Sequence, residues 1–402
     1  CPNVDVEGVA VYTNNPPAGA FRGFGVPQVN FAFESALNAL AAKAGISPWE
    51  IRWRNAVRPG DTLPNGQLAG PDAALEECLL AVKQQYEAAP GRAGVACAFK
   101  NTGLGVGHRD IGRCVVAVSD GSVEIRSGAA CVGQGLATVL AQIACDVLGL
   151  DAGRVQVAQP DTAATPDSGT TTASRQTLVT GEACRRACLA AVAALRRELS
   201  GPADRSPDRA DGGGFPYSVL AGRSFAGEYE AATDPVETDA VNPVLHVAYS
   251  YACQLAILGP DDRLERIVAA HDSGLVVDPQ AFEGQVEGGV AMGIGYALTE
   301  DFPLADCIPA ARFGQLGLLH AADVPPVQTI IVRKAGTGDA IDGGVAGAAY
   351  GAKGIGEIST IPTAAAIAGA YHARDGVLRT RLPLERTPYR APTPTPRPPS
   401  PR

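Results

Sequence analysis

The first ninety residues carry an apolar pattern that mainly predicts helices. Residues 4–13 alternate between apolar and polar side chains and predict one strand, which a Gly- and Pro-rich turn over residues 14–28 follows. The motif S-P-W-E at residues 47–50 is a capping box that begins a second helix, and residues 71–85 predict a third. The first helix is predicted between the turn and the capping box, and it ends at Gly45. Apolar residues that recur every three or four positions indicate it: Val29, Phe33, Leu37, Leu40 and Ala44.

Beyond residue 90 the pattern mixes strands with helices. Short apolar runs predict strands at 95–100, 114–118, 123–127, 155–159, 246–258 and 264–271. Longer amphipathic runs predict helices at 136–148, 180–199, 279–297 and 362–374. No fixed-period repeat is visible. These elements together predict an α+β fold built from mixed α/β subdomains.

Shifts in composition predict where the chain divides. Residues 200–215 are polar, contain Pro and include three consecutive glycines, so they are the best linker candidate. Residues 391–402 contain six prolines and predict a disordered polyproline-like tail. We therefore expect a mainly helical segment at 1–95, one α/β subdomain at 96–205 and a second at 216–390.

Composition narrows the class of protein. The 402 residues carry 33 Lys and Arg against 42 Asp and Glu, a net charge of -9 that argues against nucleic acid or an anionic membrane as the main partner. No apolar run is long enough to predict a membrane span. The ten cysteines form no C-x-x-C pair, and the five histidines show no paired spacing. We therefore expect a cytoplasmic protein with reduced thiols, no cysteine-bound iron–sulfur cluster and no histidine-bound metal.

Four short segments are candidate ligand-binding loops: R-G-F-G at 22–25, V-G-Q-G at 132–135, T-T-T-A-S-R-Q at 170–176 and K-G-I-G-E at 353–357. Glycine lets the backbone approach a ligand closely, and amide or hydroxyl groups can donate to ring heteroatoms or phosphate. Taken singly, each segment also fits an ordinary turn. The chain lacks the spacing of a Walker A loop, a G-x-G-x-x-G fingerprint or a G-x-S-x-G elbow, which argues against P-loop enzymes, Rossmann dehydrogenases and α/β-hydrolases.

Glu357 is the most interesting carboxylate for chemistry. It follows Gly-Ile-Gly and precedes an apolar stretch that begins a helix. We expect a carboxylate in that position to be poorly hydrated, and poor hydration favours proton uptake, which suits a general base. The alternative is a glutamate at a helix N-terminus, stabilised by the helix dipole.

The four segments, with a fifth motif, fit one family. The chain resembles the C-terminal half of the molybdopterin-binding subunit of the molybdenum hydroxylases, the xanthine dehydrogenase and aldehyde oxidoreductase family. Its motif sequences closely resemble those of bacterial xanthine and nicotinate dehydrogenases. The resemblance covers nearly all of residues 1–390. It rests on motifs at 13–28, 132–135, 173–176, 284–295 (G-Q-V-E-G-G-V-A-M-G-I-G) and 350–357. It implies hydroxylation of an electron-poor carbon with water as oxygen source, by molybdenum that a pterin dithiolene holds.

The resemblance also implies residue roles. Glu357 corresponds to the catalytic base, and Phe24 to an aromatic residue that stacks on planar substrates, although Phe24 also fits a core position. The implied cofactor-binding residues are Arg22, Gly23, Gly133, Gln134, Gly135, Thr172, Ser174, Arg175, Gln176 and Gly356. Among them, Gln134 would hydrogen-bond near the oxo ligand of the metal, and Ser174 and Arg175 would contact the pterin and its phosphate. A surface charge is the alternative role of Arg175.

The chain departs from the family pattern in two ways. Met292 stands where some relatives have Gln, so no contact is assigned to it. The family's preceding stretch is missing before Cys1, and the chain has no start methionine or signal peptide, so we expect a split subunit or a truncated fragment. In both cases this chain alone does not complete the active site. An apolar face toward the missing half is expected to be exposed.

The resemblance finally implies cofactors, partners and substrates. The cofactor is molybdenum–molybdopterin, with the cytosine dinucleotide form as one alternative. Iron–sulfur clusters and FAD are expected on partner subunits, together with the complementary molybdopterin-binding chain. The expected substrate is an N-heterocycle such as xanthine, another purine or nicotinate. Aldehyde oxidation by the same machinery, or a non-catalytic homologue that kept the fold, are the alternatives.

Overall fold

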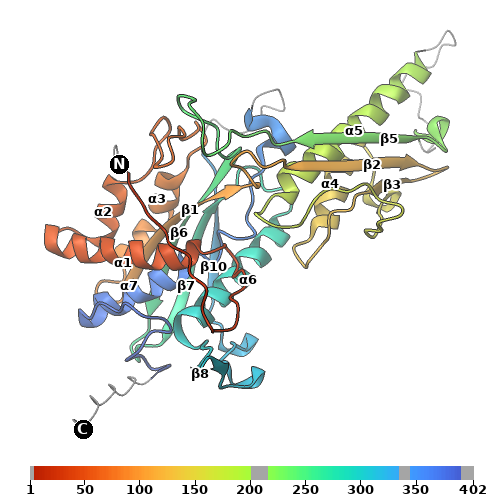
Figure 1. Ribbon diagram of the computed structural model, residues 1–402. Helices are drawn as coiled ribbons and strands as arrows, with labels where there is room; N and C mark the ends of the chain where they lie inside the picture. The colour runs from red at the N-terminus through yellow and green to blue at the C-terminus, as the bar shows by residue number, and fades with distance from the viewer. Residues whose placement is uncertain (1–3, 201–215, 335–344, 391–402) are drawn as a thin grey trace, which may run out of the picture.

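Two lobes make up the computed structural model, which describes residues 4–200, 216–334 and 345–390 (Figure 1). We call the larger lobe the body: it contains the four-stranded sheet β1-β6-β7-β10 with helices α1, α2, α3, α6 and α7. We call the smaller lobe the arm: it contains the four-stranded sheet β4-β3-β2-β5 with helices α4 and α5. The predicted α+β class is confirmed.

The body sheet is covered on both faces. Its strands are β1 (Ala93–Thr102), β6 (Ala248–Leu258), β7 (Leu264–Asp272) and β10 (Val327–Val332). Pairing is antiparallel for β1–β6 and β6–β7 and parallel for β7–β10. Helices α6 (Pro279–Leu298) and α7 (Thr363–Asp375) pack on one face, and α3 (Leu75–Glu87) packs on the other. Because neighbouring residues on a strand point to opposite faces, these strands read as almost continuous apolar runs.

The arm sheet is covered by two helices, α4 (Leu136–Leu148) and α5 (Gln176–Leu199). Its strands are β2 (Ile111–Val118), β3 (Val123–Arg126), β4 (Val155–Val157) and β5 (Ser224–Glu230). Helix α5 lies so close to the sheet that a Cβ on Gly227 would come within 2.1 Å of the Ala183 carbonyl oxygen. Glycine is therefore needed where this helix crosses the strand.

The arm is inserted in the body along the sequence, because all its strands and helices lie between β1 and β6. Both sheets combine strands from two of the predicted segments: β1 pairs with β6, and β2 pairs with β5. The division at residues 95, 205 and 216 stays a prediction about folding units. The predicted linker and tail lie outside the described residues, apart from Ser200 at the end of α5.

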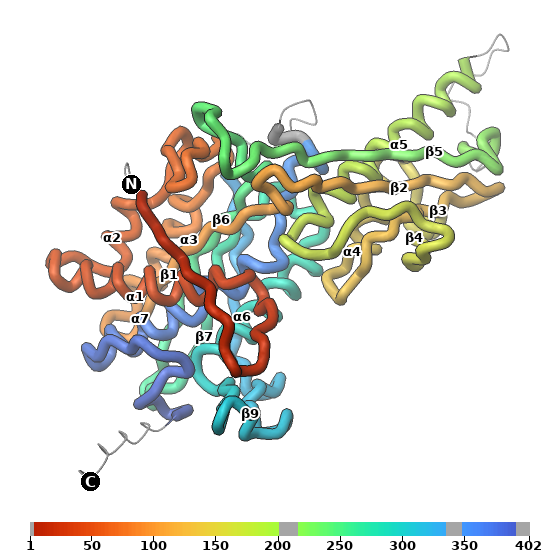
Figure 2. The backbone as a smooth tube through the Cα atoms, viewed as in Figure 1, coloured from red at the N-terminus to blue at the C-terminus, as the bar shows by residue number. Residues whose placement is uncertain are grey.

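Helix α1 (Val26–Ala44) is confirmed, but the apolar residues whose spacing predicted it do not form its buried face. Val29, Phe33 and Leu40 are 70%, 60% and 52% exposed. The buried face instead carries polar residues, because Arg52 of α2 (Pro48–Arg54) lies beneath it and donates to Glu34 Oε2 at 2.6 Å. This buried ion pair occupies the side of α1 that faces α2, the helix beside it in Figure 2, and the apolar residues lie on the exposed side.

The strand predicted at residues 4–13 is also wrong. This segment is extended but pairs with no strand in the described part of the chain, and its valines and Tyr12 are exposed. Alternation alone does not make a strand when no neighbouring strand supplies hydrogen bonds. Helix α5 begins four residues before its predicted start at 180. The sequence analysis missed β5 and β10, the hairpin of β8 (Leu304–Ala305) and β9 (Ile308–Pro309), and the 3-10 turns at Ala152–Arg154, Ser218–Leu220, Phe313–Gln315, Ala321–Asp323 and Val345–Gly351.

Among the described helices, none combines the length and the apolar character needed to cross a bilayer.

Candidate functional site

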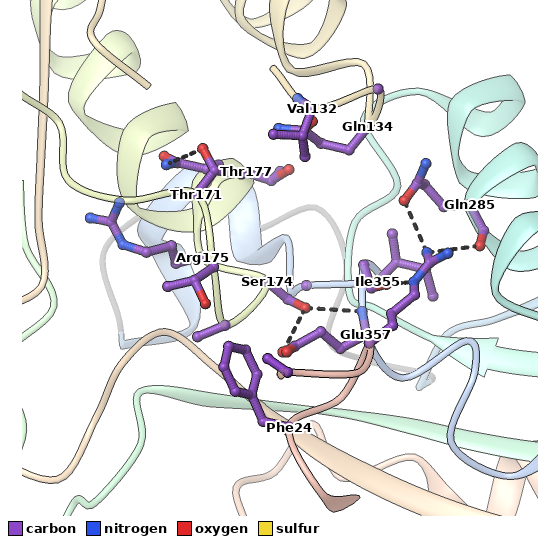
Figure 3. Close-up of a pocket in the computed structure, with 18 of the residues that line it drawn as sticks. Phe24, Val132, Gln134, Thr171, Ser174, Arg175, Thr177, Gln285, Ile355 and Glu357 are labelled. Carbon is purple, nitrogen blue, oxygen red and sulfur yellow. Dashed lines mark hydrogen bonds between the residues drawn. The ribbon is translucent and has the colours of Figure 1, made fainter. Parts of the chain in front are cut away.

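All four candidate segments line one cavity of about 600 Å³ where the arm meets the body. Two segments come from the arm, at 132–135 and 170–176, and two from the body, at 22–25 and 353–357. In Figure 3, Gln134 lies on one side of the cavity, and Glu357 and Phe24 lie on the other. Among the predicted site residues, only Gly23 and Gly135 do not line the cavity themselves.

Glu357 is largely buried, with 8% of its surface exposed, and charged and polar groups surround it. Its Oε2 accepts a hydrogen bond from Ser174 Oγ at 3.2 Å and lies 3.1 Å from Lys100 Nζ. Its backbone N–H donates to the same Ser174 Oγ at 3.1 Å. The alternative role at a helix N-terminus is wrong, since α7 begins only at Thr363. The carboxylate is therefore held in place by side chains rather than by a helix end.

The segments at 170–176 and 353–357 fit closely against each other. Ala173 and Ser174 both adopt left-handed backbone conformations, with φ of 48° and 51°. This turn brings Ser174 so close to Gly354 that a Cβ on the glycine would lie 2.3 Å from Ser174 Cβ. Glycine at 354 thus allows the contact between Ser174 and Glu357.

Arg22 connects the turn before α1 to the glutamate segment and to α6. Its Nε donates to the Gly356 carbonyl oxygen, and its Nη2 donates to both Oε1 and the carbonyl of Gln285 at 3.1 Å (Figure 3). Met292 Sδ lies 3.9 Å from Arg22 Nη1. Burial lowers the pKa of Arg22, and the charge of Glu357 opposes that shift. Arg22 therefore supports the cavity wall with most of its donors already used.

Gln134 is presented by a glycine turn at the start of α4. Gly133 and Gly135 have φ of 105° and 79°, conformations that favour glycine. The Gln134 side chain folds back on its own loop: Oε1 accepts from Val132 N at 2.6 Å, and Nε2 donates to Ala130 O at 3.2 Å. Thr171 Oγ1 donates to the same Ala130 carbonyl at 2.7 Å and so joins the two arm segments.

Arg175 reaches the cavity wall but is 1% exposed, so the surface-charge alternative is wrong. Its Nε donates to Asp110, and its other nitrogens donate to the carbonyls of Ser168, Thr170 and Ile111. Gln176 is buried beside it, with its amide bonded to Thr171 and Thr180. The guanidinium therefore holds the shape of the 170–176 segment.

Phe24 is 58% exposed and lines the cavity, so its alternative core position is wrong. Its backbone is left-handed, with φ of 53°, between Gly23 and Gly25. Among the polar residues at or beside the cavity, the sequence analysis missed Thr177, Gln285 and Lys100. Gln285 stands in the recognised 284–295 motif, which could have indicated it, whereas nothing around Lys100 marks it as a site residue.

The donor set suits an organic ligand rich in oxygen and nitrogen. The wall offers amide and hydroxyl groups from Gln134, Thr172, Thr177 and Gln285, and backbone groups of the glycine turns. Within the described ranges, no group of three or more His, Cys, Asp or Glu side chains could hold a metal ion directly. These residues fit molybdopterin, which carries its own sulfur ligands for the metal.

Comparisons with known proteins agree with this geometry. Residues 74–325 match a family model described as a molybdopterin cofactor-binding domain, and residues 1–56 match a second model with the same description. In an alignment 420 residues long, the chain is 31% identical to a probable xanthine dehydrogenase subunit of Bacillus subtilis (strain 168). The alignment covers 96% of this chain and 54% of that protein. Over 413 residues it is 33% identical to the xanthine dehydrogenase molybdenum-binding subunit of Escherichia coli O157:H7, covering 93% and 53%.

A solved structure extends the match to three dimensions. Aldehyde oxidoreductase from Desulfovibrio gigas superimposes with a TM-score of 0.72 at 26% identity, over 93% of this chain and 40% of that chain. The chain spans about half the length of the two curated relatives. By sequence and fold, the chain belongs to the molybdopterin cofactor-binding domain family, of the xanthine dehydrogenase and aldehyde oxidoreductase type.

Proposed function

We propose that this chain is the C-terminal half of the molybdenum-binding subunit of a molybdenum hydroxylase. The enzyme hydroxylates a carbon of an N-heterocycle such as xanthine, another purine or nicotinate, with water as the oxygen source. Electrons leave through iron–sulfur and FAD subunits in the cytoplasm. The observation that carries the proposal is the shared cavity, because it brings Glu357 and Gln134 together from the body and the arm.

The residues of this chain have distinct roles in the proposed reaction. When bound, molybdopterin supplies a molybdenum centre that accepts two electrons from the substrate carbon. Gln134 and Thr172 hold the cofactor through amide and hydroxyl groups, and the backbone of Gly133 and Gly356 lets it approach closely. Glu357 accepts the proton of the water that supplies the oxygen, and a positioned general base of this kind contributes about 10²–10⁴-fold to the rate.

Phe24 supports a flat heterocyclic substrate. Its ring is exposed at the cavity on the same side as Glu357 (Figure 3). An exposed aromatic ring stacks on a planar substrate and keeps the substrate carbon near the base. The second candidate is aldehyde oxidation, favoured by the structural likeness to the Desulfovibrio gigas enzyme.

The complementary molybdopterin-binding polypeptide is the partner that we propose for the exposed face of α1. The chain covers only 53% of its Escherichia coli relative, so that relative contains a stretch of similar size that this chain does not match. Val29, Phe33 and Leu40 form an exposed apolar stripe on this helix, and the valines of residues 4–12 are exposed as well. An apolar surface of this kind marks an interface.

The function is tested on the purified complex with Glu357→Gln, and Glu265→Gln serves as the control because Glu265 is an exposed partner of Arg92. We expect molybdenum content to be unchanged and turnover of a heterocycle to fall by about 10²–10⁴-fold. Full turnover with bound molybdenum would contradict the base assignment. A panel of xanthine, other purines, nicotinate and aldehydes identifies the substrate, and the absence of molybdenum from the purified complex would support the non-catalytic homologue.

The partner surface is tested separately with Phe33→Asp. We expect this variant to lose co-elution with the complementary chain while keeping its circular dichroism spectrum. Val236→Asp is the matched control, because Val236 is an equally exposed apolar residue (63%) that lies outside α1. Unchanged co-elution of Phe33→Asp would place the interface elsewhere.

A further inference from the structure

Lys100 lies directly behind Glu357, on the final residues of β1, although it does not line the cavity. Its side chain is buried, with 7% exposed, and Nζ lies 3.1 Å from Glu357 Oε2. The same Nζ donates to Asn101 Oδ1 at 2.7 Å. It also donates to the Asn101 carbonyl oxygen at 3.4 Å. The ammonium group therefore has three oxygen partners, and one of them belongs to the carboxylate to which the reaction assigns the proton.

The ends of β1 and β6 also hold the backbone of the glutamate segment. Thr102 Oγ1 accepts from Gly354 N at 2.9 Å, and Ser250 Oγ donates to the Gly354 carbonyl. Lys100 pairs with Ser250 across the two strands. The ends of β1 and β6 thus contact the segment at three places, and among these only the contact through Lys100 carries charge. At the end of β7, Asp272 adds a second charged contact through Lys353, at 2.7 Å.

Burial and charge oppose each other at Glu357. A buried carboxylate is destabilised relative to its neutral form unless a cation or several donors compensate for the lost water. The groups facing Glu357 are Lys100 from β1, Arg22 from the turn before α1 and the Ser174 hydroxyl. His246 adds no charge at neutral pH, because burial and the nearby Lys100 lower its pKa to about 4.

We propose that Lys100 is a positioning residue that compensates the buried charge of Glu357 and fixes its Oε2 on the cavity wall. This inference rests on the proposed function for its catalytic meaning. Lys100 makes Glu357 ready to accept a proton before substrate arrives. After proton transfer the ion pair loses its attraction, so release of the proton from Glu357 to solvent restores it and resets the site.

The test uses the purified complex with Lys100→Met, which removes the charge and keeps the length of the side chain, and Lys100→Arg, which keeps the charge. Lys83→Met controls for loss of a lysine, since Lys83 is half-exposed and pairs with Glu87 on α3. Two quantities are measured from about pH 5 to about pH 9. One is kcat/KM, and the other is the infrared carboxyl band of Glu357, assigned by its loss in Glu357→Gln.

In Lys100→Met we expect the acid limb of kcat/KM and the protonated carboxyl band to move together to higher pH. On that limb each unit of displacement lowers the rate about tenfold. Lys100→Arg and Lys83→Met keep the native profile. A lower rate with an unmoved limb and an unmoved band would overturn the proposal, because a merely structural lysine gives that result.

Two further measurements keep the outcomes separable. If Lys100→Met unfolds, the double variant Lys100→Met/Glu357→Gln is expected to refold, because neither charge remains unpaired in the interior. Failure of the double variant to fold would count against the pairing. If Glu357→Gln keeps full turnover, the proposed base fails, whereas the infrared band still reports whether Lys100 controls the charge of Glu357.

Discussion

Replacing Arg175 by Met distinguishes a residue that supports the fold from one that binds the cofactor. The guanidinium is buried with Asp110, and its other donors serve three backbone carbonyls. The substitution removes the cation but leaves the Asp110 carboxylate buried. Among the described residues, the Leu104 N–H at 2.8 Å from Oδ2 is then its one remaining donor. Breaking one side of a buried ion pair costs about 3–5 kcal/mol, and the carbonyls that lose donors are included in that figure rather than added to it.

The assay is hydrogen exchange of the arm, followed by mass spectrometry of peptides from β2 and α5. A loss of about 3–5 kcal/mol lowers protection there by about a hundred- to several-thousand-fold, because exchange reports the free energy of local opening. Arg113→Met is the matched control, because Arg113 lies in β2, one of the two elements whose exchange is measured. Arg113 pairs with Glu228 at 2.7 Å on the surface, where such pairs contribute about 0–1 kcal/mol.

Native protection in Arg175→Met together with loss of molybdopterin would contradict a supporting role of Arg175 in the arm. That outcome would mean that the guanidinium contacts the cofactor and does not support the arm. Arg175→Met/Asp110→Leu tests the cause of the instability. We expect it to recover part of the protection, because no unpaired charge remains buried.

Three further predictions follow from particular contacts. Gly354→Ala places a Cβ 2.3 Å from Ser174 Cβ, so we expect about 1–3 kcal/mol of destabilisation by urea titration and reduced turnover by kinetics. Native stability together with native turnover would contradict the close fit of these two segments. Burial lowers the pKa of His271 from 6.5 to about 3, so the contribution of neutral His271 to stability is complete above about pH 6.5 and is lost as the pH falls toward 3. His271→Gln should therefore flatten the dependence of the unfolding free energy on pH over that range, and an unchanged slope would contradict this role of His271. Ser47→Ala removes the side-chain acceptor of the Glu50 N–H at 3.0 Å, and we expect a loss of about 1 kcal/mol by thermal unfolding, whereas an unchanged melting temperature would show that the cap contributes nothing.

Periodicity predicted most helices and strands because their buried faces are made of apolar side chains. It predicted the helix α1 but not which face is buried, because Glu34 and Arg52 compensate each other in the interior and the apolar face lies outside. A pattern of single residues does not show that two distant charges will pair. It also missed β5, whose small and polar residues are half-exposed at the edge of the arm sheet.

The candidate site depended on resemblance more than on pattern. Each glycine segment by itself fitted an ordinary turn, and only the family motifs placed Gln134 and Glu357 at one site. The roles of supporting residues could not be predicted in this way. Arg175 was expected to bind the cofactor, but its N–H groups hydrogen-bond to other groups of the protein. Lys100 lies near the end of a strand, and no motif in the sequence around it marks it as a site residue. Such roles depend on which strands become neighbours, which is a property of the folded chain.

The insertion of the arm has a consequence for biosynthesis. On the ribosome β1 emerges long before its partner β6, with the whole of residues 111–230 made in between. At about 5–20 residues per second, β1 waits on the order of ten seconds before it can pair. During that interval its apolar side chains are available to chaperones and to other nascent chains. Slower translation after the arm would let the arm fold first, but it would also prolong this period of risk for the body.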